Sequence, residues 1–180
     1  MSLHKWLLAP TGCGLLYVRK DRIASTWPLQ AAPERRDTDI RKFEEIGTSP
    51  AATKAALNEA IAFHQAVGIE RKAARLRYLT LRWANELKKH PKVKLHSSLD
   101  AGQTWGLAVV SIAGIDSNKL VDHLWDKYRI VIVAVGHDNP KTPAYSYRGL
   151  RVTPNIYTPL EEIDTFVTAM LEVANKGLPA

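Results

Sequence analysis

The second half of the sequence alternates between apolar runs of strand length and amphipathic helices, and this alternation restricts the fold more than any other feature. Strand-length apolar runs cover residues 105–112, 129–135 and 147–153. Helical periodicity covers residues 117–128 between the first two runs, and it returns in the segment that ends at Gly177. A short sheet with helices packed on one face satisfies this order, so we predict a small α+β domain.

The first half of the sequence is much less regular. Residues 14–19 are apolar enough to predict one short buried strand. From Lys20 to Gly47 the chain is polar, and Pro28 and Pro33 interrupt any regular element. A loop of this length is uncommon inside a compact domain, so we expect the segment to lie against another part of a larger protein.

Two helices are predicted between these halves. Pro50 suits the first position of a helix, where its missing N–H costs nothing, and Ser49 before it suits the N-cap. This helix is expected to end at Gly68. A second, basic helix follows and reaches about Pro91. The last helix of the chain is expected to open with a capping box of Thr158 and Glu161.

The formal net charge of +7 raises the possibility of a nucleic-acid partner, so the placement of the basic residues matters. Between Glu70 and Lys94 basic residues greatly outnumber acidic ones. The apolar side of the helix in this segment carries Leu76, Leu79 and Trp83, so most of the charges cover its solvated side. The segment lacks the interleaved aromatic residues that stack bases, and we expect no nucleic-acid partner.

Composition limits the remaining classes. Hydrophobic residues make up 46% and charged residues 24% of the 180 residues, ordinary values for a globular chain with a core. Neither a transmembrane run nor a signal peptide is visible, so no membrane partner is expected. Cys13 is the single cysteine, which excludes an internal disulfide and a multi-cysteine zinc site and favours a cytoplasmic protein. The six histidines have no metal-ligand spacing, and we predict no metal site.

One local feature has chemical content on its own. Gly47, Thr48 and Ser49 bring a glycine, two hydroxyls and free backbone N–H groups to a predicted helix start, which is favourable for a phosphate or an oxyanion. From the residues alone, a plain helix cap is the preferred interpretation. His64 lies between the apolar positions of the same helix and is interpreted as structural or solvated.

A family resemblance changes that preference. The segment His-Lys-Trp-Leu-Leu-Ala-Pro-Thr-Gly-Cys-Gly at residues 4–14, followed by Leu-Leu-Tyr-Val, resembles the cofactor-lysine segment of class V aminotransferases, which are fold-type I enzymes that use pyridoxal phosphate. Its first four residues are most similar to the isopenicillin N epimerase-like branch. The resemblance implies that Lys5 is the catalytic lysine that carries the cofactor, with His4 beside it as a cofactor-binding residue.

Three further blocks resemble the family in the same order along the chain. Residues 43–48 resemble the segment whose threonine reaches the cofactor phosphate of the neighbouring subunit, which implies cofactor binding by Gly47 and Thr48. Residues 60–70 resemble the helix that leads to the small domain. Residues 149–158 resemble the C-terminal block whose arginine holds the substrate carboxylate, and this implies substrate binding by Arg151.

The resemblance also implies a domain organisation. Residues 1–49 correspond to the C-terminal end of the large cofactor-binding domain, residues 50–90 to connecting helices, and residues 91–180 to the small C-terminal α+β domain. Most of the large domain, including the aspartate and the aromatic residue that contact the cofactor ring, has no counterpart in this sequence. We therefore expect the C-terminal part of an enzyme that is a homodimer at full length, and we expect this chain alone to be inactive.

The implied reaction is transamination, epimerisation or elimination on an amino acid or related amine, and the residues leave the choice among these open. Cysteine desulfurases of this family use a mobile cysteine in a small-domain loop. The corresponding loop at residues 136–139 has none, so persulfide chemistry is not expected. One alternative is a non-catalytic small domain that acts as a binding or interaction module. A basic nucleic-acid-binding module is the less favoured alternative, because it explains the charge but none of the four blocks.

Overall fold

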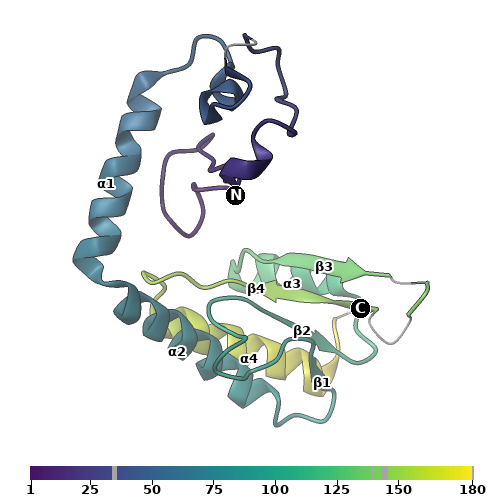
Figure 1. Cartoon of the computed structure of the whole chain (residues 1–180). Coiled ribbons are helices and arrows are strands. Elements are labelled where there is room, and N and C mark those ends of the chain that lie inside the picture. The colour runs from purple at the N-terminus through teal and green to yellow at the C-terminus, as the bar shows by residue number, and fades with distance from the viewer. Residues whose placement is uncertain (34–35, 139, 143–145, 180) are drawn as a thin grey trace. The chain divides into compact units, whose positions relative to one another are not determined.

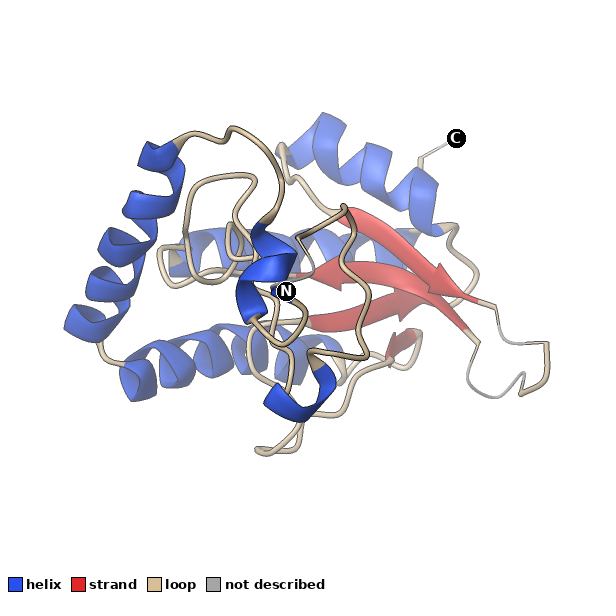
Figure 2. Cartoon of the chain, turned by 45° about the horizontal axis from the view of Figure 1, so that its top comes forward, coloured by secondary structure: helices blue, strands red, loops and turns tan. Residues whose placement is uncertain are grey.

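The computed structural model describes residues 1–33, 36–138, 140–142 and 146–179. These residues form two compact units, Met1–Val67 and Gly68–Ala180, and each unit is described by itself. Figures 1 and 2 show the elements of both units. The first unit is mainly irregular chain and one long helix, whereas the second is a sheet with helices. The assignment of residues 1–49, 50–90 and 91–180 to family domains stays a prediction.

The described residues of the first unit include the short 3-10 helices η1 (Lys20–Arg22) and η3 (Ile40–Glu44) and the helix α1 (Ala51–Val67). The segment from Lys20 to Gly47, expected to be irregular, contains η1 and η3 and is otherwise without regular structure in its described residues. The strand predicted over residues 14–19 is wrong. Gly14 makes one isolated bridge to Ser2, and residues 15–19 have no strand structure. Leu15, Leu16 and Tyr17 are exposed, since the described part of the unit holds no strand for them to join.

The second unit contains a four-stranded antiparallel sheet and three helices. The helices are α2 (Ile69–Leu87), α3 (Ser117–Tyr128) and α4 (Leu160–Lys176). The strands are β1 (Val93–Leu95), β2 (Ala108–Ile112), β3 (Val133–His137) and β4 (Tyr147–Val152), in the order β1-β2-β4-β3 across the sheet. This is the short sheet with helices on one face that the alternating pattern predicts.

One hydrophobic core joins the three helices to one face of the sheet. Leu150 and Val152 of β4 lie in this core together with Trp83 of α2 and Phe166 of α4. The Trp83 and Phe166 rings meet edge to face, with centroids 5.8 Å apart. Figure 1 shows α2 and α4 side by side and α3 behind β3 and β4. No helix formed by the described residues of this unit covers the opposite face of the sheet.

Two details of the predicted elements need correction. The strand expected from Arg129 begins only at Val133, because Arg129 has left-handed backbone (φ 56°) and ends α3. The capping box of Thr158 and Glu161 does not form: α4 has no side-chain cap, and the Thr158 hydroxyl accepts a hydrogen bond from the backbone N–H of Asn155 (2.9 Å).

Several basic residues of α2 hold the unit together rather than simply covering a solvated side. The Arg77 guanidinium donates to the carbonyl oxygens of Leu99 (3.1 Å) and Thr104 (2.8 Å). Arg82 binds both carboxylate oxygens of Asp164 at 2.7 Å and so links α2 to α4.

Lys72, another basic residue of α2, is partly buried, and this burial lowers the pKa of its ammonium group. Among the described residues, no helix is long and apolar enough to cross a membrane.

Gly149 allows β2 and β4 to pack closely. A Cβ at this position would lie 2.6 Å from the Val110 carbonyl oxygen and 3.0 Å from its carbonyl carbon, and backbone atoms cannot move aside cheaply. We predict that Gly149→Ala lowers the free energy of unfolding by about 1–3 kcal/mol, the usual cost of overpacking. Urea unfolding of this variant and of Gly102→Ala, where a Cβ meets nothing within 4 Å, checks this. Equal stability of the two variants would contradict it.

Glu172 of α4 makes a pH-sensitive link to α3. Its carboxylate accepts hydrogen bonds from the Tyr128 hydroxyl and from Lys127 Nζ (2.9 Å), and these bonds lower the pKa of Glu172 from 4.5 to about 2. A lowered folded-state pKa stabilises the fold above the unfolded pKa, and this stabilisation is lost as the pH falls from 4.5 toward 2.

We therefore predict that Glu172→Gln lowers the melting temperature at neutral pH and that the difference from wild type shrinks below about pH 4.5. Thermal unfolding over a pH series measures this. Glu161→Gln, at an exposed position in the first turn of the same helix, serves as the control. A wild-type advantage that stays constant from neutral pH down to about pH 3 would contradict the assignment.

Candidate functional site

The segment that carries Lys5 is a closed loop in the first unit. The Leu3 N–H donates to the Cys13 carbonyl (3.1 Å), and the Leu3 carbonyl accepts from the Ala9 N–H (3.2 Å). Between these ties the Leu8 N–H donates to the Lys5 carbonyl (3.1 Å), which makes a tight turn. The loop therefore presents Lys5, which is exposed, at a turn fixed by backbone hydrogen bonds.

This loop packs along one face of α1. The contacting residues of the helix are Thr53, Leu57, Ala60 and His64, whose spacing of four, three and four residues places them in one row. Leu3, Ala9 and Cys13 of the loop pack against Ala60 in a small buried cluster, with Leu57 against its edge. The Cys13 thiol lies 3.5 Å from the Thr53 carbonyl oxygen, and His64 Nε2 lies 2.8 Å from the Leu7 carbonyl oxygen.

His4 differs from its neighbours in one respect. Its Nδ1 atom is buried and has no hydrogen-bond partner among the described residues. A buried polar nitrogen without a partner is costly, because it has lost its water and gained nothing in return. The residue next to Lys5 in the chain therefore has a hydrogen-bonding atom that no described residue satisfies.

Gly47 and Thr48 lie between η3 and α1, and both are exposed. Gly47 has a positive φ of 74°, a conformation that favours glycine, and a Cβ there would meet nothing within 4 Å. Arg36 and Glu45 form an ion pair before this point, and the Lys42 ammonium donates to the Asp37 carbonyl (3.0 Å). These contacts precede Gly47, and α1 begins at Ala51, three residues after Thr48.

Arg151 lies in the second unit, near the end of β4. It pairs with Val109 of β2 and Val133 of β3, and its neighbours Leu150 and Val152 point into the core. Alternation therefore places the Arg151 side chain on the open face of the sheet. It is exposed and makes no ion pair with any described residue, so the surface-pair alternative with Glu161 or its neighbour finds no support.

Arg148 behaves differently from Arg151. Its guanidinium lies 2.5 Å from the Asp138 carboxylate, and both side chains are exposed. Because it stands three residues before Arg151 in a regular strand, its side chain points to the other face. The two arginines therefore lie on opposite faces of the sheet, and of the two Arg148 has a carboxylate partner among the described residues.

Sequence reasoning missed a polar group on the open face. His96 Nε2 lies 2.8 Å from the Ser111 hydroxyl, and the His96 ring centroid lies 5.7 Å from that of Tyr147. Burial and the nearby Lys94 lower the pKa of His96, so the imidazole is neutral at neutral pH. Ser111 follows Val109 by two residues, which places this group on the same face as Arg151.

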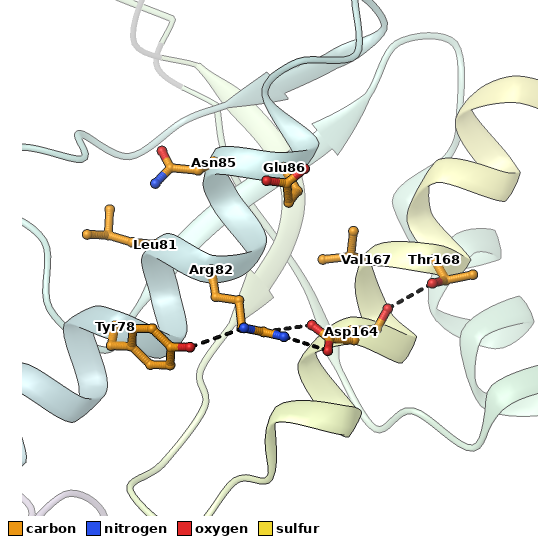
Figure 3. Close-up of a pocket in the computed structure, with 8 residues that line it drawn as sticks. All are labelled: Tyr78, Leu81, Arg82, Asn85, Glu86, Asp164, Val167 and Thr168. Carbon is orange, nitrogen blue, oxygen red and sulfur yellow. Dashed lines mark hydrogen bonds and ion pairs between the residues drawn. The ribbon is translucent and has the colours of Figure 1, made fainter.

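A large groove lies elsewhere, on the outer side of α2 and α4 (Figure 3). It has a volume of about 610 Å³, and the Arg82–Asp164 ion pair crosses it, with the Tyr78 hydroxyl 3.1 Å from Arg82. None of the residues implied by the family resemblance lines it. Among the described residues, no three histidine, cysteine, aspartate or glutamate side chains are grouped as metal ligands.

The sequence comparison identifies the family. Residues 1–166 match the family described as Aminotransferase class-V. The chain belongs to the class V aminotransferase family. Pyridoxal phosphate is the cofactor of this enzyme family.

Two curated relatives are isopenicillin N epimerases. The protein of Streptomyces clavuligerus is 30% identical, with 94% of this chain and 45% of the relative covered. The protein of Amycolatopsis lactamdurans is 29% identical, with 96% of this chain and 46% of the relative covered. The chain thus spans about half the length of these curated relatives.

Solved structures share the fold. The apo cysteine desulfurase of Thermococcus onnurineus NA1 superposes with a TM-score of 0.78 at 23% identity. The match covers 98% of this chain and 46% of the desulfurase chain. The cysteine desulfurase CsdA of Escherichia coli has a TM-score of 0.70 at 20% identity, covering 99% and 46%. A C-DES mutant with glycine linked to its pyridoxal-phosphate cofactor has a TM-score of 0.69 at 20% identity, covering 94% and 44%. At these identities the likeness shows the fold, which is fold-type I.

Proposed function

We propose that this chain forms part of a pyridoxal-phosphate-dependent enzyme, isopenicillin N epimerase-like, that acts on an amino acid or related amine. In this proposal Lys5 is the catalytic lysine, His4 assists cofactor binding, Gly47 and Thr48 bind the cofactor phosphate, and Arg151 binds the substrate carboxylate. The observation that carries it is the loop at residues 3–13, which presents Lys5 at a fixed turn within a chain of this family.

The residues present fit the cofactor. His4 Nδ1 is a buried polar atom in need of a partner, and it lies beside the lysine. Gly47 and Thr48 are exposed shortly before α1, no described atom lies within 4 Å of a Cβ added to Gly47, and the hydroxyl of Thr48 supplies a donor. Phosphate is an anion with several acceptor oxygens, and backbone N–H groups at a helix start favour it.

When bound, pyridoxal phosphate supplies an electron sink for the carbanion formed next to the substrate nitrogen. In this proposal the amine of Lys5 would hold the cofactor and would also take and return a proton at the substrate carbon. Arg151 orients the substrate, because a planar guanidinium grips a carboxylate through two parallel hydrogen bonds. Its side chain is exposed and has no carboxylate partner among the described residues.

We further propose that the reaction is not a cysteine desulfurisation. The sequence has one cysteine, Cys13, and its thiol is buried in the Lys5 loop, where it faces the Thr53 carbonyl. A persulfide-carrying cysteine needs access and mobility, which this position does not offer. Residues 136–138 contain no cysteine, and Asn139 lies outside the described residues. Transamination, epimerisation and elimination remain the candidate reactions.

The proposal includes the domain assignment and the assembly. Residues 1–49 belong to the large domain, residues 50–90 connect, and residues 91–180 form the small domain of an enzyme that is a homodimer at full length. Thr48 then serves the cofactor of the neighbouring subunit, and the chain alone is inactive. A cytoplasmic location, inferred from the single reduced cysteine, is part of the same proposal.

Thr48 gives the test of phosphate binding. In the intact enzyme, Thr48→Val should weaken cofactor binding by about 1–3 kcal/mol, because a hydrogen bond to a charged group is lost. The dissociation constant of pyridoxal phosphate, measured by titration, should therefore rise by about five- to 150-fold. Thr38→Val, at another exposed threonine of the same unit, should leave it unchanged. An unaltered dissociation constant in Thr48→Val would contradict phosphate binding by Thr48 and would leave this segment with only the role of preceding a helix.

Arg151 gives the test of substrate binding. We predict that Arg151→Lys raises the apparent Michaelis constant at least about tenfold while the cofactor spectrum stays normal, because lysine cannot make two parallel bonds to a carboxylate. Arg148→Lys is the control, since Arg148 is already paired with Asp138. If Arg148→Lys alone impaired the enzyme, the wrong arginine would have been assigned.

A further inference from the structure

His64 makes a directional contact with the Lys5 loop. Its Nε2 atom lies 2.8 Å from the Leu7 carbonyl oxygen. A carbonyl oxygen only accepts hydrogen bonds, so Nε2 must carry the hydrogen. The contact therefore exists for the neutral imidazole with hydrogen on Nε2 and for the charged form alike.

Leu7 is a central residue of the turn that follows Lys5. The turn is closed by the Leu8 N–H on the Lys5 carbonyl, which leaves the Leu7 carbonyl directed toward the helix. Leu8 has a φ of 60°, in the left-handed region that a leucine rarely adopts. Such a conformation persists only where the surroundings impose it, and strained turns of this kind cluster at functional sites.

The remaining contacts of the loop show what His64 adds. At the other end of the row, the Cys13 thiol meets the Thr53 carbonyl at 3.5 Å, a weak bond that is far from Lys5 in the loop. Ala60 and Leu57 supply apolar contact, which is not directional. His64 thus gives α1 a directional hydrogen-bond donor at the Lys5 end of the loop.

We propose that His64 is a positioning residue that holds the Lys5 turn against α1 and thereby sets where the Lys5 amine is presented to the cofactor. The inference rests on the proposed role of Lys5. Because α1 begins shortly after Gly47 and Thr48, the same helix contacts the Lys5 loop and follows the proposed phosphate-binding residues in the chain.

Hydrogen exchange of the full chain without cofactor tests the hold itself. The amide hydrogen of Leu8 closes the turn onto Lys5 and that of Ala9 closes the loop onto Leu3, so their exchange reports the opening of this segment. His64→Met fills a similar volume without a donor, and His64→Gln keeps an N–H at a similar reach. We expect exchange at Leu8 and Ala9 to accelerate about tenfold in His64→Met and to return close to wild type in His64→Gln.

Gln65→Met is the matched control, because Gln65 is the next residue of α1 and is exposed. It should leave the exchange of both amides at the wild-type rate. The melting temperature, measured in parallel, separates a local opening from general unfolding. Unchanged exchange in His64→Met, or equal acceleration in His64→Met and His64→Gln, would overturn the proposed hold.

The visible absorbance of bound pyridoxal phosphate in the intact enzyme tests the consequence for Lys5. His64→Met should lose the cofactor faster on dilution than wild type, and His64→Gln should recover most of the difference. Faster exchange with unaltered cofactor loss would overturn the positioning role. If the wild-type enzyme showed no visible band at all, the proposed function would fail, whereas the exchange experiment would still decide the hold.

Discussion

Leu3 is tied through its backbone on both sides, to Cys13 through its N–H and to Ala9 through its carbonyl, and the geometry around Lys5 depends on these two bonds. They convert a stretch without regular structure into a closed loop. A loop of this size has no core of its own, so it needs a surface to pack on. The face of α1 from Thr53 to His64 provides that surface, over a length of about 16 Å.

The second unit depends on a different constraint, which is the separation of the two faces of the sheet. The face with Leu150 and Val152 is sealed by three helices, whereas the face with Arg151 mixes apolar side chains such as Val109 and Val133 with polar ones. Gly149 lets β2 and β4 approach closely beside Arg151. The strand fixes the backbone of Arg151, and its exposed guanidinium has no carboxylate partner among the described residues, which suits the binding of an external anion.

Periodicity predicted the second unit well because its hydrogen bonds and its core are both contained in the sequence at hand. Helix α3 was predicted over the residues that it occupies, and β2 and β4 fall within the predicted runs. The short strand β1 was missed, since three residues with one lysine carry little pattern. The strand predicted at 14–19 failed because a strand also requires a partner, which the sequence pattern of one segment does not reveal.

The candidate site was less accessible to sequence reasoning. Lys5 and Arg151 were identified through family resemblance, and spacing alone did not distinguish them from surface residues. His64 was interpreted as structural or solvated, and its bond to Leu7 joins residues that are far apart in sequence. The unpaired nitrogen of His4 and the pair of His96 with Ser111 likewise depend on distances that only the folded chain defines.

The most direct measurement of the central claim is borohydride reduction of the intact enzyme with pyridoxal phosphate, followed by peptide mapping. Reduction fixes the cofactor to the lysine that holds it. We predict that the pyridoxyl group is found on the peptide that contains His4, Lys5 and Trp6. A label confined to any other lysine of the enzyme would contradict the assignment of Lys5.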